Sequence, residues 1–424
     1  MKINFYFMIV YKFGGASVKD ATGVKNLIEI VKKSTDKLLI VVSAMGKTTN
    51  ALEEIVKLSF VNIDECTEKI NQLYHQHFQI CSELFPDDSE PIDSQLKGDF
   101  SKISLLASDK SLNQFDVKYD QIVSFGEIFS TRIINAYMNT KNIKSAFVDI
   151  REVFITDETY REAIIDTDLS KSNTIKIFDF SKQSIYLTQG FIGCSKNGLS
   201  TTLGREGSDY TAAILANFLD AEKMIVWKDV EGIMNADPQC FDKTERLNKI
   251  SYQEAVELAY FGAKVIHPKT LKPLHNKNIP LYVKSFINPT GQGTTIHDYN
   301  EYDQNLPLYI IKKDQMLISL FPKDLSFVIE DGLKDIFQYL SLHRVKVNLI
   351  QNSAISISFC IDNSYVKIGE LLEYFQKEYK VLYNENLELL TIRHYSEKDV
   401  LKLTARRKIF IEQRSRHTAH FVIQ

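Results

Sequence analysis

Continuous apolar runs alternate with longer amphipathic stretches over the first 300 residues of the chain. Each run is rich in Val, Ile, Phe or Tyr, and most end in Gly, Ser or Asp. Such runs are typical of strands buried on both faces, as in a parallel sheet covered by helices. The runs are FMIVYKF (7–13), LLIVVSA (38–44), SAFVDI (145–150), SIYLTQGF (184–191), KMIVWKDV (223–230) and IPLYVKSF (279–286).

Between these runs the apolar spacing is helical, as in GVKNLIEIVKKS (23–34) and YTAAILANFL (210–219). The alternation predicts an α/β fold with ligands at the carboxyl ends of the strands. From 51 to about 115 there is no strand-like run, which predicts a helical excursion, broken at PDDSEPIDSQ (86–95). The polar segment HDYNEYDQNLP (297–307) predicts the main domain boundary, between residues 1–300 and 308–424.

After residue 308 the predicted elements become shorter and follow the order βαββαβ. They are MLISLF (316–321), a helix in 327–343, KVNLIQ (346–351), AISISFCI (354–361), a helix in 366–379 and YKVLYN (379–384). A second, shortened copy of this order follows, with strands in 387–395, 408–415 and 418–424 and one helix in 396–404. The strand LYII (308–311) can supply an edge of this second copy, so that the first copy, about 315–385, is inserted in the second.

Composition narrows the possible partners and compartments. The chain has 51 Lys and Arg against 54 Asp and Glu, a net charge of −3, which argues against nucleic acid as the main partner. The apolar start MKINFYFMIV is too short to span a bilayer and predicts a first strand, which a start at Met8 would keep intact. Five scattered cysteines without metal or redox spacing indicate a reducing cytoplasm.

Three segments carry candidate chemistry. In VYKFGGASVKD, Lys12, Gly14 and Gly15 come directly after a strand, where glycines let backbone N–H groups approach a phosphate and a lysine neutralises charge. An ordinary glycine turn explains the same letters equally well. In STTLGREGSDYTAA (200–213), Ser208 and Asp209 stand at a helix start.

The second segment also contains Arg205, which can form a bidentate pair with a carboxylate. A capped helix with a surface salt bridge is the alternative, and the two interpretations are compatible. The third segment, VWKDVEGIMNADPQ (226–239), predicts a loop after a strand that holds a nucleotide base and ribose, although Asp229 and Gly232 also suit a plain turn.

Six motifs in order identify a family resemblance. They are KFGGAS, VVSAMGKTTN, VSFGEIFST, TTLGREGSDYTAA, WKDVEGIMNADP and FGAKVIHPKT. With them the chain resembles the aspartate kinases of the amino acid kinase family along essentially its whole length. The resemblance implies a parallel-sheet α/β sandwich followed by two ferredoxin-like ACT domains, the second shortened. It implies a monofunctional kinase that transfers a phosphoryl group from ATP to the side-chain carboxylate of L-aspartate.

The resemblance also implies residue roles. Lys12, Asp209 and Lys264 would be catalytic. The substrate-binding residues would be Ser43, Thr49, Glu127, Arg205 and Ser208. The nucleotide-binding residues would be Gly14, Gly15, Lys228, Asp229, Met234 and Lys264, with Mg²⁺ carried by the nucleotide and no metal site of the protein's own. Glu127 would meet the substrate ammonium and Arg205 its α-carboxylate.

The regulatory expectations come from the same resemblance. An amino-acid effector, lysine or threonine, would bind near Ile329 to Asn348, and the chain would form a homodimer or a higher homo-oligomer. A kinase of the same family acting on another acid, and an inactive amino-acid sensor, are the alternatives.

Three positions depart from the family pattern. Glu206 replaces a glycine, Lys228 replaces a threonine, and Gln239 stands where some members have arginine. A carboxylate at 206 would repel phosphates unless it points away or pairs. His75 and His77 are too close to share a helix face, so they are not expected to form a metal site.

Overall fold

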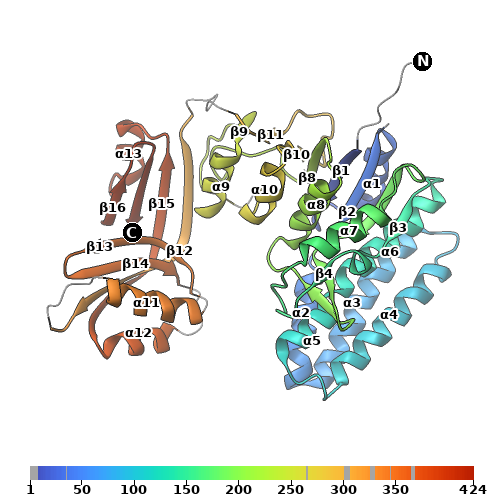
Figure 1. Ribbon diagram of the computed structural model, residues 1–424, viewed down its shortest axis with the longest axis horizontal. Helices are drawn as coiled ribbons and strands as arrows, with labels where there is room; N and C mark the ends of the chain where they lie inside the picture. The colour runs from blue at the N-terminus through green and yellow to red at the C-terminus, as the bar shows by residue number, and fades with distance from the viewer. Residues whose placement is uncertain are drawn as a thin grey trace. The chain divides into compact units, whose positions relative to one another are not determined.

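The computed structural model describes residues 8–34, 36–263, 266–299, 306–324, 330–343, 345–363 and 368–424. The chain divides into two compact units (Figure 1). The first comprises Met1–Ile233, Arg246–Val256 and Val265–Asp303. The second comprises Met234–Glu245, Glu257–Lys264 and Gln304–Gln424.

An eight-stranded sheet in the order β3-β5-β2-β1-β8-β10-β11-β9 forms the core of the first unit. All its neighbouring strands are parallel except β10 and β11. The strands are β1 (Met8–Phe13), β2 (Lys37–Val42), β3 (Ala146–Val148), β5 (Ile185–Gln189), β8 (Lys223–Lys228), β9 (Lys249–Ser251), β10 (Leu281–Ser285) and β11 (Thr294–His297). Central strands such as β1 and β2 are buried at nearly every position, which confirms the prediction from continuous apolar runs.

Helices connect and cover these strands. Helix α8 lies against β1, β2 and β8 and packs on α10, while α6 lies against β2 and β5. The helices that begin in this unit are α1 (Ala21–Lys32), α2 (Thr48–Val61), α3 (Ile63–Leu84), α4 (Glu90–Ser108), α5 (Phe115–Val123), α6 (Phe125–Thr140), the 3₁₀ helix η1 (Ile150–Glu152), α7 (Thr167–Ile177), α8 (Gly207–Phe218), α9 (Tyr252–Tyr260) and α10 (Pro268–His275).

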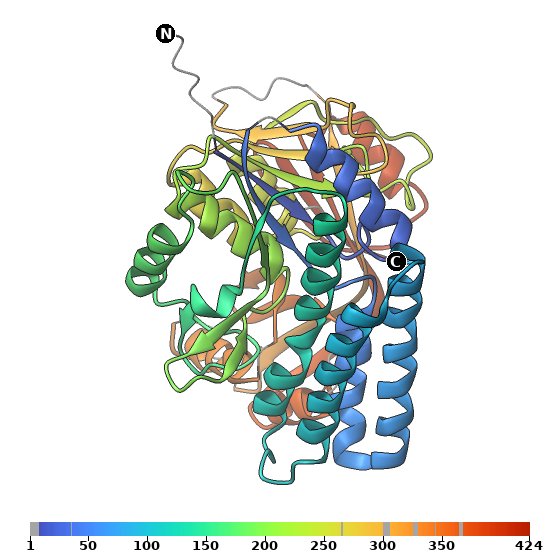
Figure 2. The ribbon, with the colours of Figure 1, turned by 90° about the vertical axis from the view of Figure 1, so that its right-hand side faces the viewer.

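The segment 51–115 contains most of α2 and all of α3 and α4, and α5 begins at its last residue; α3 and α4 lie side by side (Figure 2). The break between α3 and α4 is shorter than the predicted 86–95, because α4 already begins at Glu90. Pro91 lies in its first turn, where a missing backbone N–H leaves no hydrogen bond unmade.

A small second sheet in the order β4-β6-β7 was missed by the sequence analysis. Its strands are β4 (Ile155–Thr156), β6 (Ile192–Ser195) and β7 (Ser200–Thr202). They are two to four residues long and partly polar, so they lack the apolar runs on which the prediction relied.

The second unit is built on a six-stranded antiparallel sheet in the order β13-β14-β12-β15-β17-β16. Its elements are β12 (Leu308–Pro322), α11 (Glu330–Leu342), β13 (Val347–Ser353), β14 (Ser356–Asp362), α12 (Ile368–Gln376), β15 (Tyr379–Arg393), α13 (Glu397–Thr404), β16 (Ile409–Arg414) and β17 (Thr418–Ile423). Its apolar clusters include one that contains side chains of α11 and α12, one that contains side chains of α13, and one built from strand residues such as Leu317, Leu389 and Val422.

Strands β12 and β15 each run for 15 residues, where the sequence predicted separate shorter strands. They pair from Leu308 opposite Arg393 to Pro322 opposite Tyr379, with register shifts between Lys312 and Leu317. Asp314 and Asn386 have φ of 55° and 56° near these shifts. Asp and Asn tolerate this left-handed conformation better than most residues, so polar positions that suggested a break instead form an irregularity within a continuous ladder.

No helix among the described residues is long and apolar enough to cross a membrane.

Replacing a large side chain by alanine should affect stability differently at the two ends of β15. Ile392 is fully buried in the cluster that contains α13, whereas Leu382 is 50% exposed. We expect Ile392→Ala to lower the free energy of unfolding by about 2–4 kcal/mol, because it leaves a cavity in a packed cluster. Leu382→Ala is the matched control and should cost less than about 1 kcal/mol. Urea unfolding measures both, and equal losses would contradict this account of the core.

Candidate active site

Asp209 holds two lysines in one ion-pair array at the carboxyl ends of neighbouring parallel strands. Lys12, near the end of β1, places its Nζ 2.5 Å from Oδ1 of Asp209. Lys228, the last residue of β8, places its Nζ 3.7 Å from Oδ2. Asp209 itself lies in the first turn of α8, which packs against both strands. A long helix and two parallel strands therefore bring together charges that are about 200 residues apart.

Two members of the array are buried, and the ion pairs determine the protonation state of Asp209. Lys12 is 7% exposed and Asp209 is 2% exposed. Burial alone would raise the pKa of Asp209, but the charges of Lys12 and Lys228 outweigh burial and lower it. Asp209 is therefore an anion near neutral pH, and two cations share it.

The glycine pair after β1 is explained by close approach. A Cβ on Gly15 would lie 2.6 Å from the carbonyl oxygen of Ala44, so only glycine fits against that loop. A Cβ on Gly14 would lie 3.6 Å from Nζ of Lys12. The backbone N–H of Gly46 also donates to the carbonyl of Gly15 at 3.0 Å. The loops that follow β1 and β2 are thus locked together beside the lysine.

Glu127 is a buried acid that contacts the same Ala44 loop as Gly15. Its Oε1 accepts from the backbone N–H of Ala44 at 3.2 Å, and its Oε2 has no hydrogen-bond partner among the described residues. Burial raises the pKa of Glu127 to about 8, against smaller opposing effects of the Ala44 bond and of Lys12. In the free protein Glu127 is therefore largely protonated at neutral pH.

The remaining predicted substrate residues lie on the surrounding loops. The backbone N–H of Ser43 donates to the carbonyl of Phe13 at 3.1 Å, at the end of β2. Ser208 is buried in α8, so close to the end of β5 that a Cβ on Gly190 would lie 2.6 Å from its Cβ. Thr49 lies in the first turn of α2.

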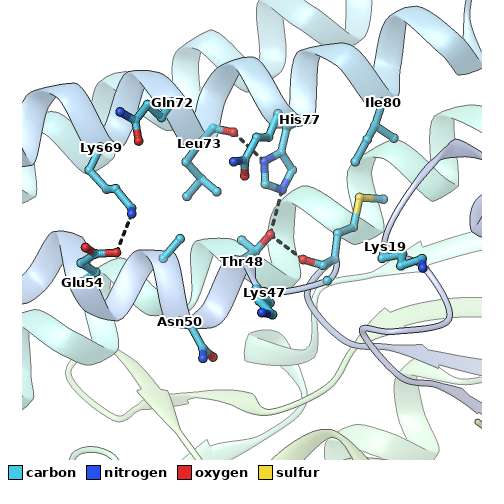
Figure 3. Close-up of a pocket in the computed structure, with 14 residues that line it drawn as sticks. Lys19, Lys47, Thr48, Asn50, Glu54, Lys69, Gln72, Leu73, His77 and Ile80 are labelled. Atoms are coloured by element: carbon cyan, nitrogen blue, oxygen red, sulfur yellow. Dashed lines mark hydrogen bonds and ion pairs between the residues drawn. The ribbon is translucent and has the colours of Figure 1, made fainter.

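The neighbour of Thr49 has a structural role. Thr48 Oγ1 donates to the carbonyl of Met45 at 2.6 Å and lies 3.3 Å from Nε2 of His77 (Figure 3). The Nδ1 of His77 lies 2.9 Å from the carbonyl oxygen of Leu73, and burial lowers the pKa of His77 to about 4. His77 is therefore a neutral core residue that anchors the start of α2.

Thr48 and His77 both line a cavity of about 320 Å³ between α2 and α3 (Figure 3). Lys19, Lys47 and Lys69 line it, and Lys69 pairs with Glu54 at 2.6 Å. None of the site residues predicted from the sequence lines this cavity.

Other predicted site residues are placed as follows. Arg205 is exposed in the turn before α8 and enters no ion pair among the residues that the structure describes. Asp229 is exposed after β8. Met234 belongs to the second compact unit, and Lys264 lies outside the described residues.

Asp120, which no sequence motif singled out, is a buried acid that holds the strand leading to the turn before α8. Asp120 is fully buried in α5 and accepts from the N–H and Oγ1 of Thr202, at 2.8 and 2.7 Å, and from the N–H of Arg161. Burial raises the pKa of Asp120 to about 6, although these hydrogen bonds oppose the rise. The sequence signal that could have indicated Asp120 is an acidic residue among the apolar positions of a predicted helix.

The family model described as the amino acid kinase family matches residues 7–285. The chain belongs to the amino acid kinase family. Its relatives include the lysine-sensitive aspartokinase 3 of Escherichia coli, 32% identical over 363 residues, which are 84% of this chain and 79% of that protein. The aspartokinase of Chlamydia pneumoniae is 28% identical, over 84% of this chain and 78% of that protein.

Solved structures give the same assignment within the family. The chain is similar to E. coli aspartokinase III in complex with aspartate and ADP, with a TM-score of 0.85 and 28% identity over 98% of this chain and 96% of that one. The complex of aspartokinase III with lysine and aspartate gives a TM-score of 0.81 at 27% identity. The predicted fold class, an amino acid kinase sandwich followed by ACT domains, is confirmed.

Removing the charge of Asp209 should destabilise the protein more than removing the charge of a carboxylate on the surface. Asp209→Asn leaves Lys12 buried without its anion, so we expect the free energy of unfolding to fall by about 3 kcal/mol. Glu53→Gln is the control, because Glu53 pairs with Lys57 on the surface at 2.8 Å and such pairs contribute less than about 1 kcal/mol. Chemical unfolding compares the two, and a loss for Asp209→Asn no larger than for the control would contradict the array's role.

Proposed function

We propose that this protein is an aspartate kinase. It transfers the γ-phosphoryl group of ATP to the side-chain carboxylate of L-aspartate, giving 4-phospho-L-aspartate and ADP. This reaction is the first step of lysine, threonine and methionine biosynthesis. The observation that carries the proposal is the ion-pair array of Lys12, Asp209 and Lys228, because it holds cations at the carboxyl ends of two parallel strands. The similarity to a kinase solved with aspartate and ADP supports the choice of substrates.

The reaction needs positioning and charge neutralisation rather than a general base. The attacking carboxylate of aspartate is already ionised near neutral pH. Lys12 bridges that carboxylate and the γ-phosphate, and Asp209 holds the ammonium of Lys12 in place. Gly14 and Gly15 line the phosphates, and Ser43, Thr49 and Ser208 contact the substrate.

Lys228 and Asp229, at the end of β8, bind the nucleotide in this proposal. Of the two residues expected in the same role from the family resemblance, Met234 belongs to the second unit and Lys264 lies outside the described residues. The donor set fits a Mg²⁺ ion held mainly by the ATP phosphates, since the carboxylate of Asp209 is already shared by two lysines. When bound, that ion neutralises charge on the phosphates.

The head group of aspartate needs one cation and one anion. Arg205 is exposed for the α-carboxylate, and Glu127 has a buried carboxyl oxygen without a partner among the described residues. An ammonium group placed against Glu127 would favour its ionised form. Binding of the substrate is thereby coupled to loss of the Glu127 proton.

The C-terminal part is proposed to be regulatory. Residues 1–300 form the catalytic domain, with 51–115 as its helical excursion, and 308–424 form a tandem ACT region. The pairing of Leu308 with Arg393 supports insertion of the first copy, about 315–385, in the second.

The effector, lysine or threonine, binds near Ile329–Asn348, of which 329 and 344 lie outside the described residues. A relative solved with lysine supports the effector class. Edge strands β13 and β16 support a homodimer through this region. The cysteines, which form no disulfide, support a reducing cytoplasm.

One assay separates this function from its alternatives. Aspartyl phosphate formed from ATP is trapped by hydroxylamine and measured as the hydroxamate. With L-aspartate as the substrate, we expect hydroxamate to form and ADP to be released in equal amounts. Product with glutamate or carbamate in place of aspartate would indicate another kinase of the family. Binding of lysine or threonine without any turnover would indicate an amino-acid sensor.

Lys12 is expected to act in the transition state. Lys12→Ala should lower kcat by about 10²- to 10³-fold, because a preorganised cation at developing charge is lost. Circular dichroism serves as the folding control, and Lys57→Ala, on the surface of α2, should keep the wild-type rate. A kcat within a factor of a few of wild type would remove Lys12 from the transition state.

Glu127 gives the reaction a pH dependence. Because its pKa in the free protein is about 8, Glu127 is protonated below that pH and cannot pair with an ammonium group. The KM for aspartate should therefore fall as the pH rises from 6 to 8, by up to about tenfold per unit, and level off above 8. Glu127→Gln should have a high KM without this slope. A pH-independent KM in the wild-type protein would contradict the assignment.

A further inference from the structure

Glu206 adopts a backbone conformation that suits glycine. Its φ is 54° and its ψ is 28°, in the left-handed region that residues with a side chain rarely occupy. It stands at the N-cap of α8, yet its side chain makes no capping hydrogen bond to the helix. The conformation is therefore strained, and the side chain does not relieve that strain by capping.

The carboxylate of Glu206 carries a second cost. Its Oε2 is excluded from solvent and has no hydrogen-bond partner among the residues that the structure describes. A desolvated carboxylate oxygen without a donor is unfavourable. Strain and an unsatisfied polar atom at one residue are typical of functional sites, where a ligand completes the arrangement.

The surrounding charges show what kind of ligand is missing. The carboxylate of Asp209, three residues on, is already matched by Lys12 and Lys228. Within the described part of the chain, Glu206 forms no ion pair, and neither does its exposed neighbour Arg205. The turn before α8 thus presents one cation and one anion side by side in the sequence, each lacking a counter-charge.

We propose that Glu206 binds the α-ammonium group of the amino-acid substrate, beside the α-carboxylate held by Arg205. Adjacent opposite charges match the zwitterionic head of an α-amino acid. An ammonium group has three N–H donors, so Glu127 and Glu206 accept from different ones. This inference rests on the proposed function and adds a specificity-determining residue to it.

The test uses two variants of the full chain. Glu206→Gln keeps the shape and the strained backbone but removes the charge, and Glu206→Gly also removes the strain. Glu222→Gln is the control, because Glu222 is exposed just beyond α8. Calorimetric titration measures binding of L-aspartate and of succinate, which is aspartate without its ammonium group, and the assay gives the KM for ATP.

We expect both Glu206 variants to bind aspartate about 10- to 100-fold more weakly, as for loss of a hydrogen bond to a charged group. Succinate binding and the KM for ATP should stay unchanged. Glu206→Gly should also melt about 2 °C higher than wild type, since the left-handed conformation suits glycine. Weaker function together with higher thermal stability is a combination that a merely structural role does not produce.

Three results would overturn the inference. Equal weakening of aspartate and succinate would mean that Glu206 only shapes the loop. A raised KM for ATP that excess Mg²⁺ restores would assign the carboxylate to the metal on the nucleotide. Unchanged aspartate binding would leave Glu206 without a ligand. In each case wild-type turnover of aspartate would persist, whereas failure of the proposed function would appear as no hydroxamate and no aspartate binding in the wild-type protein.

Discussion

The neutralisation of the buried Lys12 and the half-buried Lys228 by one carboxylate is the interaction on which the site depends. Lys12 and Lys228 end neighbouring parallel strands, so their positive charges point to the same edge of the sheet. Without Asp209 they would repel each other in a region of low dielectric. The position of Asp209 is in turn fixed by the packing of α8 against β1 and β8. The sheet, the helix and the ion pairs therefore determine one another.

Close backbone approaches complete this arrangement, and they explain particular glycines. Gly15 lies against the carbonyl of Ala44, and Gly190 lies against Ser208 in the first turn of α8. A methyl group at either position would meet atoms at 2.6 Å and push the loops apart. The backbone N–H of Ala44 in the same loop donates to Glu127, so the acid, the glycine loop and Lys12 are held in one connected set of contacts.

Much of the fold was predictable, because buried parallel strands leave continuous apolar runs in the sequence. The six strands predicted in the first 300 residues all occur. The small sheet with β6 and β7 left no such signal, and β15 was divided because its irregularity at Asn386 resembles a turn in sequence. The residues of the ion-pair array were singled out from motifs, but their mutual distances were not. Asp120 was missed because its partner Thr202 is 82 residues away.

The charge balance of the free site connects these observations to substrate recognition. Lys12 and Lys228 bring two positive charges and Asp209 brings one negative charge, while Glu127 keeps its proton at neutral pH. The array is thus net positive before any ligand binds, which suits ATP and a dicarboxylate. The positive array would repel an ammonium group unless an anion lies close to that group. Glu127 supplies one by releasing its proton. The Oε2 of Glu206 is excluded from solvent and has no hydrogen-bond partner among the described residues. An acidic side chain beside the cationic array would therefore allow a site that attracts anions to accept a zwitterion as well.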